Sequence, residues 1–148
     1  MTVSRMSFAG AFPEGLGAVL GLEKAVGASG LESGLVTLVK LRASQLNGCA
    51  YCLDMHLREA REAGESNARL DVVGAWREID SRFTARERAA LALTEQVTHV
   101  SQGGVTDDVW TQVEAEFSEH EIGALLTAIS AINVWNRIAI TTHQQPEG

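Results

Sequence analysis

Proline placement is the feature of this sequence that most restricts its fold. The two prolines of the 148-residue chain are Pro13 and Pro146, so almost the whole chain lies between them. Proline lacks the backbone N–H and clashes with the preceding turn, so a chain without it is free to be helical. Strand-type alternation is almost absent, and the pair Asn47-Gly48 is flanked by segments of helical period rather than by hairpin strands. The sequence therefore predicts an all-α fold.

Helix start and stop signals divide the chain into about six or seven helices within one domain, residues 1–148. Ser29 with Glu32 and Thr84 with Glu87 have the spacing of capping boxes. Gly64 has the position of a helix stop. The predicted helices cover residues 16–26, a segment opened by Ser29 and ending at 46, then 49–63, 67–76, 84–100, 106–117 and a long last helix capped by Ser118 and Glu121.

The last predicted helix is apolar on more than one side. A helix that is apolar most of the way round is buried on several sides. This pattern fits either a subunit interface or a central core helix. Its apolar residues include Leu125, Leu126, Ile129, Ile132, Val134, Ile138 and Ile140.

Charge and hydropathy narrow the class of protein. With 19 acidic and 12 basic residues the net charge is −7, which argues against a nucleic-acid or anionic-membrane surface. No stretch has the roughly 18 to 20 uninterrupted apolar residues of a membrane span. We expect a cytoplasmic protein, and in that reducing compartment two cysteines three residues apart are not a structural staple.

The chemistry of the chain is concentrated in Cys49, Cys52 and His56. Offsets of three and four residues place all three on one helix face, with the CxxC pair at the start of that helix. Helix geometry puts Cα atoms three residues apart at roughly 5 Å, inside the window of about 4.4–6.8 Å that a disulfide requires. The pair is thus predicted to cycle between dithiol and disulfide.

Two effects favour a thiolate here, and they favour different cysteines. Cys49 lies where free backbone N–H groups and the helix dipole stabilise negative charge. Cys52 has His56 one turn further on, where the imidazole can take the thiol proton. The spacing alone leaves open which cysteine attacks a peroxide. Zinc binding is the alternative interpretation, with His99, His120 or His143 as a fourth ligand beside the three motif residues.

At this motif the sequence resembles the AhpD-like alkylhydroperoxidase branch of the carboxymuconolactone decarboxylase family. The likeness runs through residues 41–56 and continues in segments 59–65, 75–78, 87–92 and 132–137. It implies an AhpD-like helical domain that reduces hydrogen peroxide or organic hydroperoxides in antioxidant defence. It also implies that Cys52 is the peroxidatic cysteine, Cys49 the resolving cysteine and His56 the proton relay.

The resemblance implies partners as well. No bound cofactor or metal is expected, and an external lipoyl- or thioredoxin-like dithiol would reset the disulfide. The family forms trimers or hexamers built as trimers of dimers, so we expect a homo-oligomer.

One position departs from the family pattern. Family members often carry a relay glutamate twelve residues before the first cysteine, and here that residue is Thr37. Glu95, on another predicted helix, is a candidate substitute. An incomplete relay also leaves room for a second activity, in which the chain passes electrons as a dithiol adaptor to a separate peroxidase.

Overall fold

The computed structural model describes residues 3–148, and within that range it contains helices and loops but no strand. The all-α prediction is therefore confirmed. Six of the described helices have ten residues or more, and the remainder are short α or 3-10 segments. The elements are α1 (Phe8–Ala11), α2 (Pro13–Gly27), α3 (Ser33–Asn47), α4 (Ala50–Glu62), α5 (Asn67–Leu70), η1 (Val73–Glu78), α6 (Ala85–Thr98), η2 (Val100–Gln102), α7 (Asp107–Glu116) and α8 (Glu119–Thr142).

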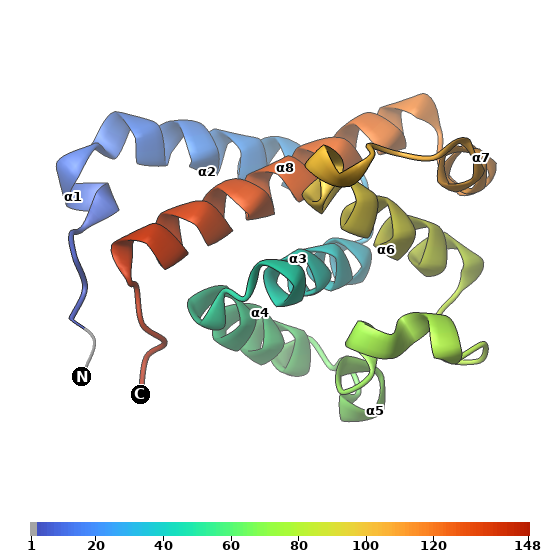
Figure 1. Ribbon diagram of the computed structural model, residues 1–148, viewed down its shortest axis with the longest axis horizontal. Coiled ribbons are helices and arrows are strands. Elements are labelled where there is room, and N and C mark those ends of the chain that lie inside the picture. The colour runs from blue at the N-terminus through green and yellow to red at the C-terminus, as the bar shows by residue number, and fades with distance from the viewer. Residues whose placement is uncertain (1–2) are drawn as a thin grey trace.

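Helix α3 is the centre of the fold (Figure 1). It packs against α4, α6 and α8, while α2 lies along α8 and α7 packs on α6. The first described residues lie beside the C-terminal end of α8, and the backbone N–H of Arg5 donates to the carbonyl of Thr142 at 2.8 Å. The first and last segments of the chain are thus joined at one end of the molecule.

The main core forms where α3, α6 and α8 meet. Aliphatic side chains from all three helices are fully buried there, and each contributes about 1.5–3 kcal/mol through removal from water. This burial fixes the relative positions of the helices that carry the site. The largest of these side chains are Leu38, Leu91, Leu93, Leu125 and Ile129.

Helix α8 is a core helix. Ile129, Ile132 and Asn136 on it are fully buried, and it contacts α2, α3 and α6. By length and composition alone α8 could also cross a membrane, but a substantial share of its most apolar window is buried inside the protein. The core interpretation of its apolar pattern is confirmed, whereas the subunit-interface interpretation stays a prediction.

Two of the predicted helix caps are present. Thr84 and Glu87 form a reciprocal capping box at the start of α6. The hydroxyl of Ser118 accepts a hydrogen bond from the backbone N–H of Glu121 at the start of α8. In both cases the side chain satisfies an N–H group that has no partner within the helix.

The predicted capping box of Ser29 and Glu32 is wrong. Helix α3 begins later, at Ser33, with no side-chain cap on its N-cap residue Glu32. The Ser29 hydroxyl instead donates to the carbonyl of Val26 at the end of α2. Gly30, with φ of 89°, turns the chain between the two helices, so Ser29 belongs to the stop of α2 rather than to the start of α3.

The predicted helix over residues 67–76 is also wrong in its extent. The chain instead forms α5 followed by the 3-10 segment η1, within which Ala75 leaves helical geometry. The helix expected over 84–100 ends at Thr98. Weak periodicity in these short segments gives the sequence little power to set their ends.

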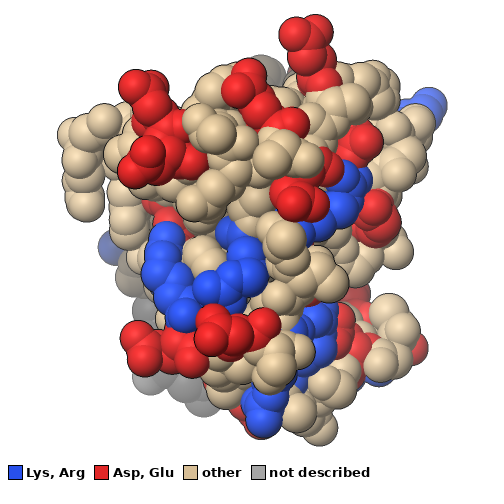
Figure 2. All heavy atoms as spheres, turned by 90° about the vertical axis from the view of Figure 1, so that its right-hand side faces the viewer, with Lys and Arg blue, Asp and Glu red and all other residues tan. Residues whose placement is uncertain are grey.

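Acidic and basic side chains are interleaved on the face shown in Figure 2, where arginines lie next to carboxylates. Among the described residues Arg86 pairs with Glu32 and Glu121, and Arg69 pairs with Glu65 and Glu87. Such pairs neutralise the basic side chains locally and contribute about 0–1 kcal/mol each where they are exposed.

A partly buried amide network joins the end of α3 to α8. The Asn47 side chain donates to the side-chain oxygens of Asn133 and Asn136 on α8, each at 2.9 Å. Asn136 in turn donates to the hydroxyl of Ser44 at 3.1 Å, and Asn133 donates to that of Thr98. The network ties the last turn of α3 to the middle of α8.

Replacing Asn136 tests the strength of this tie. Asn136→Ala would leave the buried Ser44 hydroxyl without its side-chain partner and remove one of the two acceptors of the Asn47 amide, so we expect a loss of about 1–3 kcal/mol in the free energy of unfolding. Urea denaturation measures the change. Gln112→Ala, on an exposed position of α7, is the control and should change stability by no more than about 0.5 kcal/mol. Similar stability of the two variants would contradict the proposed tie.

Candidate functional site

The turn between α3 and α4 presents both cysteines. Helix α3 ends at Asn47, Gly48 adopts the left-handed conformation with φ of 69°, and Cys49 is the extended N-cap of α4. Glycine adopts this conformation without the cost that a side chain would bring. Two residues therefore suffice to turn the chain, and the predicted position of the CxxC pair at a helix start is confirmed.

Cys49 and Cys52 form a disulfide with 5.4 Å between their Cα atoms, within the range that disulfides require. The sulfur of Cys49 also accepts a hydrogen bond from the backbone N–H of Cys52 at 3.3 Å. In the reduced protein the same N–H group would favour a thiolate on Cys49. Both side chains are buried, each with 1% of its surface exposed.

His56 follows Cys52 by one turn of α4 and is also buried. Its Nδ1 lies 3.0 Å from a carboxylate oxygen of Glu59, which can only accept, so Nδ1 carries a proton in this contact. Its Nε2 is buried and has no hydrogen-bond partner among residues 3–148. Burial lowers the pKa of His56 below the ordinary 6.5, and the hydrogen bond to Glu59 opposes this only in part. Nε2 is therefore the basic nitrogen of a neutral imidazole.

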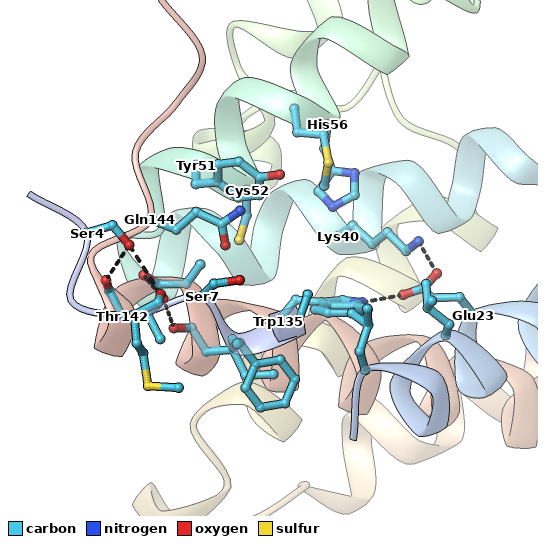
Figure 3. Close-up of a pocket in the computed structure, with 18 of the residues that line it drawn as sticks. Ser4, Ser7, Glu23, Lys40, Tyr51, Cys52, His56, Trp135, Thr142 and Gln144 are labelled. Atoms are coloured by element: carbon cyan, nitrogen blue, oxygen red, sulfur yellow. Dashed lines mark hydrogen bonds and ion pairs between the residues drawn. The ribbon is translucent and has the colours of Figure 1, made fainter. Parts of the chain in front are cut away.

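Cys52 and His56 line one cavity of about 600 Å³ (Figure 3). Cys49 is not among the lining residues, so of the two sulfurs that of Cys52 faces the cavity. Apolar side chains from α2, α4 and α8 form much of the wall. They include Leu16, Leu20, Met55, Trp135 and Ile138.

The two ends of the chain complete the cavity wall. Ser4, Met6 and Phe8 line it from the N-terminal segment, and Thr142 and Gln144 line it from the C-terminal end. The guanidinium of Arg5 donates to the carbonyl of Thr141 at 3.0 Å, which adds a side-chain contact between the two segments.

The cavity also contains an ion pair that the sequence analysis missed. The Nζ of Lys40 on α3 lies 2.5 Å from Oε2 of Glu23 on α2. The other carboxylate oxygen of Glu23, Oε1, accepts a hydrogen bond from the indole of Trp135 at 3.1 Å. No short-range pattern in the sequence connects Glu23 with Lys40, because they lie on different helices. Glu59, also missed, was recognisable, because residues three apart share a helix face.

Glu95 lies elsewhere in the molecule. Its carboxylate accepts from Arg77 at 2.6 Å and from the indole of Trp76 at 3.0 Å, and Arg42 lies at 3.4 Å. Burial by itself would raise the pKa of Glu95, but the hydrogen bonds from Arg77 and Trp76 outweigh it and lower the pKa. Glu95 does not line the cavity, and its relay role stays a prediction.

Thr37 occupies the position at which the sequence resemblance implies a relay glutamate. The hydroxyl of Thr37 donates to the carbonyl of Ser33 within α3 at 3.0 Å. Thr37 is not a lining residue of the cavity. Its side chain is thus engaged with its own helix.

The histidines proposed as further zinc ligands lie apart along the chain. His99 ends α6, His143 ends α8 and His120 lies in the first turn of α8, where it contacts the carbonyl of Ser29. Within residues 3–148 no group of three or more His, Cys, Asp or Glu side chains is arranged to hold a metal ion. The zinc alternative therefore gains no support from the described residues.

A protein-family model, a sequence relative and a solved structure each match more than half of this chain. Residues 12–96 match the model of the carboxymuconolactone decarboxylase family. The uncharacterized protein YdfG of Bacillus subtilis is 37% identical over 92% of this chain and 92% of its own length. A crystal structure from Agrobacterium tumefaciens, of a protein of unknown function that carries the antioxidant-defence name AhpD, is 42% identical. It superposes with a TM-score of 0.94 over 99% of both chains.

A more distant structure shows the fold alone. The alkylhydroperoxidase AhpD core protein of Ralstonia eutropha is 21% identical and has a TM-score of 0.80. The alignment covers 94% of this chain and 74% of that one. The resemblance noted in the sequence is confirmed by these matches.

The buried imidazole predicts a dependence of stability on pH. In the unfolded chain His56 takes up a proton as the pH falls through 6.5, whereas in the folded protein its lowered pKa delays protonation. The unfolded state therefore binds more protons between these two values, and stability falls as the pH decreases through that window. His56→Gln should remove this part of the slope, which is at most about 1.4 kcal/mol per pH unit.

Urea unfolding at a series of pH values measures the slope. Gln112→Ala, which replaces an exposed residue without a titratable group, is the control and should keep the wild-type slope. Equal slopes for wild type and His56→Gln would show that the imidazole is not held neutral.

Proposed function

Because the chain belongs to the carboxymuconolactone decarboxylase family, we propose that it is a thiol-dependent peroxidase of the AhpD-like branch. Family membership and the CxxC pair point to an antioxidant or peroxidase-related role. One observation supports the finer assignment more than any other. Cys52, which carries a redox-capable sulfur, and His56, whose basic Nε2 has no hydrogen-bond partner among the described residues, line the same cavity.

In the proposed first step His56 Nε2 takes the proton of the Cys52 thiol. The thiolate attacks the terminal oxygen of the hydroperoxide, and the O–O bond breaks to give a Cys52 sulfenic acid. The departing alkoxide takes the proton back from His56 and leaves as an alcohol. Glu59 keeps Nδ1 protonated and so keeps Nε2 as the accepting nitrogen.

The second step closes the disulfide. Cys49 attacks the sulfenic acid of Cys52, and one water is released as the S–S bond forms. The N–H group of Cys52 favours the thiolate of Cys49, which suits a resolving thiol. An external dithiol then reduces the pair by disulfide exchange and is itself oxidised. We propose a lipoyl- or thioredoxin-like donor, a homo-oligomeric assembly and a cytoplasmic location on the strength of the family resemblance.

The cavity supports organic hydroperoxides as substrates. Its volume of about 600 Å³ lies within the range typical of small-molecule sites and far exceeds what hydrogen peroxide fills. Its wall is mostly apolar, so the carbon body of an organic hydroperoxide would be removed from water on binding.

Two serine variants test the proposal. Cys52→Ser should reduce peroxide consumption with dithiothreitol to background, because no thiolate then faces the cavity. Cys49→Ser should leave a sulfenic acid on Cys52 that dimedone traps and mass spectrometry locates. Unchanged turnover in Cys52→Ser would reject the peroxidase. Rapid disulfide exchange without peroxide reduction in the wild type would indicate the dithiol adaptor instead.

A further inference from the structure

The Lys40–Glu23 ion pair lies in an unusual place for two charged side chains. Both are largely buried, with 16% and 24% of their side-chain surfaces exposed. The carboxylate of Glu23 is held from two sides, by Lys40 on α3 and by Trp135 on α8. A buried ion pair is weak support for a fold, because apolar residues of similar volume often stabilise as well or better. Packing alone therefore does not explain these charges.

The pair lies beside His56. Figure 3 shows the Lys40 side chain between the His56 ring and Glu23, on the wall of the shared cavity. The positive charge of Lys40 lowers the pKa of His56, and the negative charge of Glu23 raises it. The two partners thus act on the same imidazole in opposite directions.

The other charged and titratable side chains around His56 determine which charges act on its ring. From α4, Glu59 favours the charged imidazole, and Tyr51 and Cys52 are the remaining titratable side chains on that cavity wall. The lining residues from α8 and from both ends of the chain carry no charge. Lys40 is therefore the cation that offsets the two carboxylates around the ring.

We propose that Lys40 and Glu23 are positioning residues for His56, in which the Lys40 ammonium adds to burial in favouring the neutral imidazole and the Glu23 carboxylate opposes it. The proton-accepting Nε2 is then available at neutral and mildly acidic pH. The catalytic meaning of the pair rests on the proposed peroxidase function, whereas its effect on His56 does not.

The test is an NMR titration of the His56 ring in the disulfide form, in which neither cysteine titrates. Lys40→Met should raise the pKa of His56 by about one unit, because a like charge near the ring is lost. Glu23→Gln should lower it, because a carboxylate is lost while Lys40 remains. Lys40→Arg should restore a value close to that of the wild type. Asp54→Asn, which removes an exposed ion pair with Arg58 on α4, is the control and should cause no shift.

The opposite signs separate this role from a structural one. If the pair only supported packing, both variants would leave the His56 titration unchanged or move it in the same direction, and either result would overturn the inference. If Lys40→Met fails to fold, the sign of the Glu23→Gln shift still decides. In active protein the acidic limb of the pH profile for peroxide turnover should move with the His56 pKa. If the wild-type protein does not turn over peroxide, the proposed peroxidase function is rejected. The NMR titration would still test the effect of Lys40 and Glu23 on His56.

Discussion

The hydrogen bonds from Asn47 to the two asparagines of α8 are the contacts on which the rest of the site depends. They hold the last turn of α3 against the core, and this fixes where Gly48 turns the chain. Gly48 sets the start of α4, and that start sets the direction in which Cys52 and His56 point. A buried amide adds little stability when it is hydrogen-bonded, but it costs much more free energy when it has no partner. The conformation of the turn between α3 and α4 is therefore set mainly by the cost of conformations that leave these amides unpaired.

The electrostatics of the cavity follow from burial. An imidazole withdrawn from water favours its neutral form, whereas two nearby carboxylates favour the charged form. Burial and the nearby ammonium of Lys40 both favour the neutral imidazole, and together they outweigh those carboxylates. The same surroundings that lower the stability of a charged ring make its free nitrogen useful for proton transfer.

Local signals in the sequence were enough to predict a large part of this structure. The CxxC pair at a helix start, His56 one turn later and the cap at Thr84 follow from spacing along a single helix. Predictions failed where a distant residue or a turn decided the outcome. Ser29 has the spacing of a cap, but the turn at Gly30 assigns it to the preceding helix. Glu23 gave no signal, because its significance depends on α2, α3 and α8 meeting around one cavity.

Helix α4 and the segments near both chain ends contribute different parts of the cavity wall. Cys52 and His56 belong to α4, whereas another part of the wall comes from residues near both chain ends, joined through Arg5 and the final turn of α8. Substitutions in those terminal segments can reshape this part of the cavity wall without altering the helix that carries Cys52 and His56. For the proposed peroxidase, the residues that would select a substrate are thus partly distinct from those that would react with it, and each set can change while the other stays constant.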